Sequence, residues 1–348
     1  MDIASQRLHN QHITSPRRGS PADLVAALGA VQAQEYAFAK WALALRLRLR
    51  TTDAAIEGAL NRGEILRTHV LRPTWHFVAA PDLVWLQQLT GARVSARLAT
   101  YLRNFGIENR TQIKAVAVIE RALGGGRYLT RQELRARMGR AGIALGGTPL
   151  ALVIMNAELE HVICSGPRRG KQFTYGLVTE RAPMARALPR DEALAELTRR
   201  YLGSHGPATI RDFVWWSSLS TSDVRRGLDI IKARSLEQDG CTYWTVNSGK
   251  GPPRRAAQVH LLPIYDEFLV AYRDRLAVAY GPTAYTRGPR RHSLVINGRV
   301  AGTWMMDPAR RVSITPVRRL TSPERASVAA EVARFARFLG VEVTVRMA

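Results

Sequence analysis

Apolar and polar residues follow two periods within residues 20–80, first that of short helices and then that of strands. The pattern predicts three helices, which begin near Ser20, Tyr36 and Thr52, and two strands over residues 65–70 and 74–79. Ser20 and Asp23 have the spacing of a capping box, in which a hydroxyl and an acid three residues later satisfy free N–H groups at the helix start. Three helices followed by a hairpin are the order of elements in a winged helix.

The same order recurs twice further along the chain. The capping spacing is repeated before three helical runs, at Thr130 with Glu133, Thr209 with Asp212, and Ser220 with Asp223. The two copies are completed by a helix over 149–161 and by extended runs within 162–178, 235–237 and 243–246. Helices over 82–103 and 112–123 are expected to pack between the first two modules. The sequence therefore predicts an α+β protein with three tandem winged-helix modules.

The last hundred residues are richer in β-branched side chains. Extended runs are predicted at 260–272, 292–296, 299–304, 312–316 and 341–345, with a helix that begins near Ser322. Asn297 and Gly298 form a dipeptide that is typical of a two-residue hairpin turn. Four parts are expected: a first winged helix with packing helices (1–125), a second (126–185), a third (186–248) and a β-rich C-terminal subdomain (249–348).

The charge of the chain indicates a polyanionic partner. Its 51 Lys and Arg residues against 28 Asp and Glu give a net charge of +23. Arginine suits bidentate contacts with phosphate, so nucleic acid is the favoured partner. A GC-rich genome would explain arginine over lysine but not the deficit of acids, and no basic amphipathic helix suggests a membrane surface. Three winged helices could grip DNA together, or one could bind while the others act as a scaffold.

The remaining composition argues against several other classes of protein. No segment has about 18 uninterrupted apolar residues, and the N-terminus lacks the pattern of a secretory signal. The two cysteines, Cys164 and Cys241, are too few for a disulfide framework, so a cytoplasmic location beside the nucleoid is expected. Residues 166–172 imitate a phosphate loop but are one residue short and lack its Ser or Thr. No metal or cofactor is expected.

Two glutamines, Gln32 and Gln34, stand in a stretch of small residues between the first two predicted helices. Side chains two residues apart share one face only in an extended segment, since on a helix they diverge by about 200°. An extended connector is plausible here, although a Gln-Ala-Gln sequence is usually only a polar stretch of surface. The pair becomes informative together with three other segments of the chain.

Jointly, four blocks of sequence resemble the winged-helix DNA glycosylases of the AlkZ/YcaQ superfamily. They are Val31-Gln32-Ala33-Gln34-Glu35, the run Leu66-Arg67-Thr68-His69-Val70-Leu71-Arg72-Pro73-Thr74-Trp75-His76-Phe77, the run Leu262-Pro263-Ile264-Tyr265-Asp266-Glu267-Phe268 with Asp274-Arg275, and Asn297-Gly298-Arg299-Val300-Ala301-Gly302-Thr303-Trp304. The resemblance extends from about residue 4 to 345. It implies three winged helices in a C-shaped arrangement and an activity that unhooks azinomycin interstrand crosslinks.

The resemblance also implies the catalytic residues. The superfamily motif is Gln-x-Gln in the AlkZ-like branch and Gln-x-Asp in the YcaQ branch, so Gln32 and Gln34 place this chain in the former, which is associated with self-resistance to genotoxic natural products. An amide does not titrate, so the substrate must supply the driving force, as a purine alkylated at N7 does because it leaves as a neutral base. We expect Gln34 to orient the water and Gln32 to fix Gln34 or share that water. Glu35 is a reserve carboxylate that alternation turns away.

Basic side chains on two predicted hairpins and one loop are candidate DNA contacts. The first hairpin carries Arg67, His69, Arg72, Thr74 and His76, which line the site, grip phosphates or form a solvated wing, while Trp75 is expected in the core. The second hairpin carries Arg168, Arg169 and Lys171, and the loop carries Lys250, Arg254 and Arg255. One of these groups is expected to enter the minor groove.

Asp266 and Glu267 are acids within an apolar run. They lie near the lesion or, as the favoured alternative, pair internally with Arg273 or Arg275. Trp304 is expected in the core, and the Trp215-Trp216 pair is expected to place one ring in the core and the other at the surface.

The sequence supports a monofunctional glycosylase that acts as a monomer on double-stranded DNA carrying alkylated purines. A winged-helix transcription regulator and a non-enzymatic lesion-binding protein are the alternatives. The Gln pair, the second block and the three modules favour the enzyme.

Overall fold

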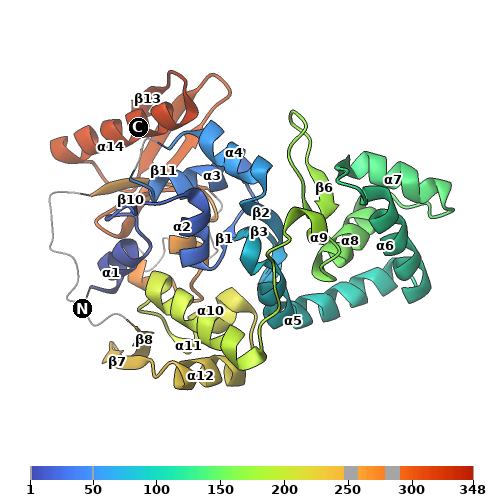
Figure 1. Cartoon of the computed structure of the whole chain (residues 1–348). Coiled ribbons are helices and arrows are strands. Elements are labelled where there is room, and N and C mark those ends of the chain that lie inside the picture. The colour runs from blue at the N-terminus through green and yellow to red at the C-terminus, as the bar shows by residue number, and fades with distance from the viewer. Residues whose placement is uncertain (1, 49–50, 247–257, 279–290, 348) are drawn as a thin grey trace.

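The computed structural model describes residues 2–48, 51–246, 258–278 and 291–347. The predicted basic loop with Lys250, Arg254 and Arg255 lies outside these residues. The described chain is an α+β protein, as the sequence predicts, and its helices are grouped around four sheets (Figure 1).

The first group of elements follows the predicted order of helices and hairpin. It contains α1 (Ile3–Asn10), α2 (Pro21–Leu28), α3 (Tyr36–Leu45), α4 (Asp53–Arg62) and a sheet in the order β1 (Val31–Gln32), β3 (Arg72–Ala79), β2 (Ile65–Val70). The Ser20 hydroxyl accepts from the Asp23 N–H and the Asp23 carboxylate accepts from the Ser20 N–H, which confirms the first capping box. The Thr52 hydroxyl caps α4 by accepting a hydrogen bond from the Ala55 N–H.

A second group forms the lobe at the right of Figure 1. The short η1 (Ala80–Asp82) leads into the long α5 (Leu83–Asn104), and α6 (Asn109–Leu123), α7 (Arg131–Arg140) and α8 (Gly147–Leu159) follow. The sheet has the order β4 (Leu129–Thr130), β6 (Thr174–Leu177), β5 (Ile163–Ser165), and α9 (Val178–Arg181) ends the group. The capping box of Thr130 and Glu133 begins α7 as predicted.

The third group consists of three helices and one hairpin. Its elements are α10 (Arg190–His205), α11 (Ile210–Ser217), α12 (Thr221–Ile230), β7 (Arg234–Gln238) and β8 (Cys241–Thr245). Capping boxes at Thr209 and Ser220 begin α11 and α12. Each of the three groups therefore has helices before a small antiparallel sheet, which is consistent with the predicted winged helices.

The C-terminal part is a five-stranded sheet with one long helix. The strands are ordered β13 (Thr344–Met347), β12 (Arg311–Pro316), β11 (Arg299–Met306), β10 (His292–Ile296), β9 (Val259–Leu262), and α14 (Ser322–Leu339) packs against them. Asn297 and Gly298 both have positive φ, at 51° and 79°, as the tight β10–β11 turn requires.

One prediction for this part was wrong. The extended run expected over 260–272 ends as a strand at Leu262, and α13 (Glu267–Val270) follows. Asp266 begins this helix because its carboxylate accepts a hydrogen bond from the Phe268 N–H. The turn before it carries Tyr265 with a φ of 64°. The short 3-10 helix η2 (Leu276–Val278) comes next.

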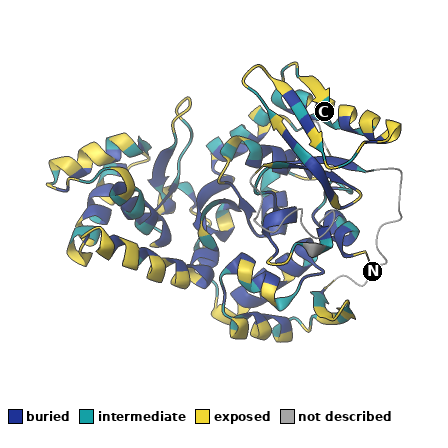
Figure 2. Ribbon diagram, turned by 180° about the vertical axis from the view of Figure 1, so that it is seen from behind, coloured by how far each residue is buried: buried dark blue, intermediate teal, exposed yellow. Residues whose placement is uncertain are grey.

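Three apolar cores hold the chain together, and they do not follow sequence order. The first core combines α1–α4 with the C-terminal sheet, the second combines β2 and β3 with α10–α12, and the third lies within the lobe of α6–α8 (Figure 2). The helix α5 belongs to two of them, since Leu86 and Leu89 pack in the second core and Val94 and Leu98 in the third. None of the helices in the described ranges has the length and hydrophobicity needed to cross a membrane.

Candidate active site

The extended backbone predicted for the two glutamines reaches only as far as Gln32, because Gln34 and Glu35 lie in a bend before α3. Gly29 ends α2 with a φ of 82°, and Val31 and Gln32 then form the strand β1. Gln32 lies opposite His76 of β3, and the Ala33 N–H donates to the Trp75 carbonyl at 2.7 Å. Because the strand ends at Gln32 and Gln34 lies in a bend, strand alternation does not place the two side chains on one face.

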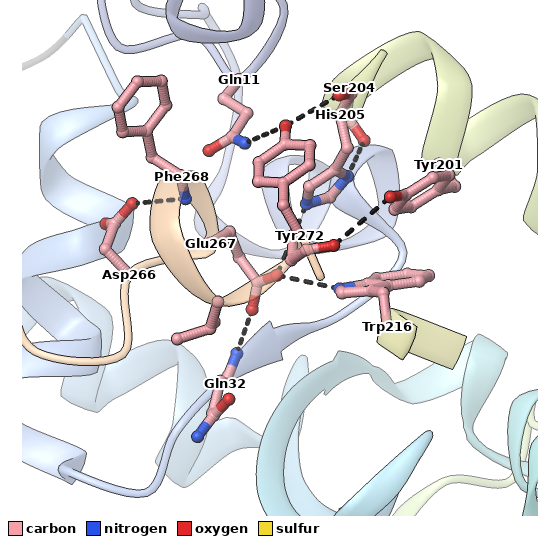
Figure 3. Close-up of polar contacts among 12 residues, drawn as sticks. Gln11, Gln32, Tyr201, Ser204, His205, Trp216, Asp266, Glu267, Phe268 and Tyr272 are labelled. Carbon is pink, nitrogen blue, oxygen red and sulfur yellow. Dashed lines mark hydrogen bonds and ion pairs between the residues drawn. The ribbon is translucent and has the colours of Figure 1, made fainter. Parts of the chain in front are cut away.

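Both the backbone and the side chain of Gln32 are held by charged groups. Its N–H donates to the Glu267 carboxylate at 2.7 Å (Figure 3), and its side-chain Oε1 accepts from Nη2 of Arg72 at 2.7 Å. Arg72 in turn donates from Nη1 to the Val270 carbonyl at 3.1 Å. Gln32 is 8% exposed, so only a small part of it faces solvent.

Glu267 is a fully buried carboxylate with several donors around it. Besides the Gln32 N–H, it accepts from the indole Nε1 of Trp216 at 2.9 Å, and Nε2 of His205 lies 3.5 Å away (Figure 3). Burial alone would raise the pKa of Glu267. The nearby imidazole of His205 and the charge of Arg72 outweigh it and lower the pKa to about 2. Glu267 is therefore an anion that fixes the backbone of the Gln32 segment.

Asp266, its neighbour, pairs with an arginine that is distant in sequence. Its two carboxylate oxygens accept from Nη1 and Nη2 of Arg46 at 2.9 and 2.7 Å, and both side chains are buried. The favoured prediction that Asp266 forms an internal ion pair is confirmed, but the predicted partners, Arg273 and Arg275, were wrong. Arg275 instead donates to the Leu269 carbonyl, and the Arg273 guanidinium lies over the Trp215 ring.

A cleft of about 560 Å³ opens beside Gln32. It lies where the first sheet, α5, α11 and the turn before α13 meet. The lining residues are Gln32, Arg72, Pro73, Thr74, Arg93, Val94, Arg97, Val214, Trp215, Ser218, Tyr265, Val270 and Arg275. Four of them are arginines, so the cleft is electropositive and suited to a phosphate backbone.

Several groups that often act as acids, bases or nucleophiles are absent from the described lining of the cleft. Among the described residues that form the cleft, there is no carboxylate, imidazole, thiol or lysine amine. No group of three or more His, Cys, Asp or Glu in the described part of the chain could hold a metal ion. The cleft thus offers amide, hydroxyl and guanidinium groups, together with the indole of Trp215.

The second glutamine lies at the surface. Gln34 and Glu35 are exposed, and neither is among the residues that line the cleft. Glu35 is the residue before α3, and its side chain makes no capping hydrogen bond. The structure therefore brings Gln32 into the cleft directly and leaves Gln34 in the exposed bend two residues further along.

Three of the predicted contacts on the first hairpin lie inside the protein. Arg67 lies 4.2 Å from the centre of the Trp75 ring and donates to the Ala33 carbonyl, and burial lowers its pKa to about 10. His69 hydrogen-bonds to Glu158, and His76 is fully buried. These side chains therefore do not form the surface cluster that was expected.

The other two residues of that hairpin, Arg72 and Thr74, do line the cleft. Arg72 is half-buried, and both of its terminal nitrogens have partners in the protein. The expected role of Arg72 as a grip on phosphate is therefore changed, because each terminal nitrogen already donates one hydrogen bond inside the protein, to Gln32 or to Val270, and the Nε–H is buried. Trp75, which was expected in the core, is only half-buried.

Two of the three basic side chains of the second hairpin contact other parts of the protein. Its Arg168 is half-buried and lies 5.0 Å from the centre of the Tyr36 ring, and Arg169 pairs with Glu133 at 2.8 Å. Lys171 is exposed at the tip. Of this predicted basic group, Arg169 and Lys171 have the exposure that a DNA contact needs.

The predictions for the other three tryptophans, Trp215, Trp216 and Trp304, are confirmed. Trp216 is fully buried while Trp215 is 39% exposed, and Trp304 is buried with its indole N–H donating to the Leu262 carbonyl. The Trp215 indole N–H donates to the Val270 carbonyl at 3.0 Å, the same oxygen that Arg72 contacts. An exposed ring is thereby held rigidly in the wall of the cleft.

Comparisons with known proteins agree in family and fold. The family model "DNA glycosylase AlkZ-like" matches residues 25–338. The interstrand DNA cross-link repair glycosylase of Streptomyces sahachiroi is 25% identical over 369 aligned positions, which cover 97% of this chain and 96% of the relative. The solved structure of Streptomyces sahachiroi DNA glycosylase AlkZ superposes with a TM-score of 0.81 at 23% identity, covering 100% of this chain and 98% of the other.

Proposed function

This chain belongs to the AlkZ-like DNA glycosylase family, and from that membership we propose that it hydrolyses the N-glycosidic bond of purines alkylated at N7. The proposal includes the unhooking of interstrand crosslinks, since a relative is named for that repair. It also includes self-resistance to a genotoxic natural product. The observation that carries it is Gln32, held on a strand at the wall of a cleft with four arginines.

The proposed reaction needs no group that titrates near neutral pH. Water attacks the anomeric carbon, the bond from that carbon to N9 breaks, and its electron pair neutralises the cationic purine. The proton lost by the water passes to solvent. Gln34 accepts a hydrogen bond from the water and orients it, with Gln32 beside it, because positioning and fixed dipoles each contribute several kcal/mol to such steps. Glu35 is not required.

We further propose a monofunctional enzyme. A bifunctional glycosylase needs an amine to attack the sugar, and the described lining of the cleft contains no lysine. The partner is double-stranded DNA, bound by a monomer in the cytoplasm at the nucleoid. Arg93, Arg97, Arg169 and Lys171 are the proposed phosphate contacts among the described residues.

The wild-type protein should release N7-methylguanine from duplex DNA under single-turnover conditions, and Gln34→Ala should slow this step at least about tenfold, which corresponds to roughly 1.4 kcal/mol. The loss is expected because the oriented water is no longer held. Abasic sites are revealed as strand breaks after alkali. Gln88→Ala removes an exposed glutamine of α5 that does not line the cleft, and it should retain the wild-type rate.

Equal rates for Gln34→Ala and wild type would remove Gln34 from the mechanism. A sequence-specific footprint without any abasic product, from N7-methylguanine or from a bulkier N7 adduct, would contradict the glycosylase activity itself.

The single-turnover rate should be independent of pH between about pH 6 and 9. Burial lowers the pKa of His76 to about 3, and the surroundings of Glu267 lower its pKa to about 2. Both pKa values lie below this window, so His76 stays neutral and Glu267 stays ionised throughout it. The measurement is a pH–rate profile corrected for spontaneous depurination. A limb near pH 6–7 would show that an imidazole takes part, and a carboxylate-like limb at lower pH would point to Glu35.

A further inference from the structure

We propose that Arg72 is a positioning residue that fixes the side-chain amide of Gln32 with its NH₂ group toward the cleft, so that Gln32 is a hydrogen-bond donor in the reaction. This inference rests on the proposed function, because it concerns the same site. It assigns a polarity to an amide whose two ends look alike in size and shape.

The chemistry of Arg72 determines which end of the amide faces it. A guanidinium carries N–H donors and no acceptor, so the atom of Gln32 that lies 2.7 Å from Nη2 must be the carbonyl oxygen. A flipped amide would set two donors against each other at that distance. In the described part of the chain, no hydrogen bond involves the NH₂ group of Gln32, although the residue lines the cleft.

Arg72 is itself held in place. It begins β3, and its Nη1 donates to the carbonyl of Val270 on α13. The preceding residue, Leu71, is buried with a φ of 61°, a conformation that a leucine rarely adopts, and its N–H donates to the Thr90 hydroxyl. The turn at Leu71 therefore fixes the direction in which the side chain of Arg72 extends from the start of β3.

The backbone of Gln32 is fixed from another direction by Glu267. The Gln32 N–H donates to the carboxylate at 2.7 Å, and that carboxylate is anchored by Trp216. One carboxylate on α13 and one guanidinium on β3 therefore hold the backbone and the side chain of the same residue. Neither amide rotation nor strand displacement is possible without breaking a charge-assisted hydrogen bond.

The orientation divides the work between the two glutamines. Gln32 presents the positive end of its dipole to the cleft, so it can hold the oxygen of the water but cannot stabilise a developing sugar cation. The acceptor role in the proposed reaction then falls to the carbonyl of Gln34, which is expected from the sequence to orient the water.

The first experiment replaces the amide without losing the contact to Arg72. Gln32→Glu keeps an oxygen for the guanidinium but removes the NH₂ donor, so single-turnover release of N7-methylguanine should fall at least about tenfold. If Gln32 acts instead through its carbonyl, the added negative charge would maintain or raise the rate, and that outcome would overturn the proposal. Thermal unfolding of the variant checks that its fold is retained.

The second experiment asks whether Arg72 acts through Gln32, by means of a double-mutant cycle with Arg72→Ala and Gln32→Ala. Arg72→Ala should slow base release in the wild-type background and have little further effect in Gln32→Ala. Arg72→Lys, which restores one donor, should recover part of the rate. Additive losses would mean that Arg72 serves the substrate directly, and they would overturn the proposal.

Salt dependence of DNA binding separates this inference from the proposed function. A phosphate contact contributes about 0.9 to the slope of log K against log salt concentration. Arg72→Ala should leave that slope unchanged, whereas Arg97→Ala, from the same cleft, should flatten it by about one. Failure of the wild type to release base from N7-methylguanine and from a bulkier N7 adduct would contradict the proposed function and, with it, the role of Gln32 as a donor. A flattened slope for Arg72→Ala in an active enzyme would overturn only the positioning role.

Discussion

The protein should release N7-methylguanine from duplex DNA about 10²- to 10⁴-fold faster than uracil or undamaged guanine. This ratio is expected because general acid catalysis, which only the neutral bases need, usually contributes a factor of that size. A neutral base needs a proton on leaving, and a cationic base does not. The described lining of the cleft contains no carboxylic acid or imidazole to supply that proton. Its four arginines are held too firmly in the charged form to act as acids at neutral pH.

The measurement compares duplexes of one sequence that carry each base at the same position, under single turnover. A uracil-specific glycosylase supplies the positive control for the uracil duplex. Release of uracil at a rate within tenfold of N7-methylguanine would show that a proton donor, either the Tyr265 hydroxyl of the lining or a group from outside it, serves the leaving base, and the proposed mechanism would not stand.

Asp266→Ala should lower the free energy of unfolding by about 3–5 kcal/mol, because it leaves the guanidinium of Arg46 buried without its counter-charge. Asp266 accepts two hydrogen bonds from Arg46 and one from the Phe268 N–H, so the start of α13 is weakened as well. Urea unfolding followed by circular dichroism measures the change.

The matched control is an exposed ion pair of the same kind. Asp191 and Arg226 lie 2.6 Å apart at the surface of the third group of helices. Asp191→Ala should cause no measurable change, since solvent screens both charges. A loss below about 1 kcal/mol for Asp266→Ala would mean that Arg46 finds another partner or reaches water.

Local sequence signals predicted most of the elements correctly. The boxes at Thr130, Thr209 and Ser220 begin helices as expected, because capping depends only on residues three apart. The strands β2 and β10 have the predicted bounds. The short α13 was missed because one turn of helix within an apolar run has no period to detect.

The supports of the candidate site could be predicted only in part. The bend at Gln34 was not visible in the sequence, whereas the extended backbone at Gln32 and the unusual acids Asp266 and Glu267 were. Their partners were not, since Glu267 lies 235 residues from Gln32, and Arg46 lies 220 residues from Asp266. Sequence neighbours suggested Arg273 and Arg275 instead. Similarly, burial of Arg67 and His69 depends on how two modules pack together, which no local pattern contains.

The division of α5 between two cores has a mechanical consequence. Its first half is packed with α10 and β3, and its second half with α8. The helix, about 33 Å long, therefore joins the lobe of the second group to the rest of the protein as a single stiff rod. Arg93 and Arg97 project into the cleft where the rod passes from one core to the other. Bending of α5 between Leu89 and Val94 would therefore move these two charges relative to Gln32. The width of the cleft thus depends on how straight this one helix stays.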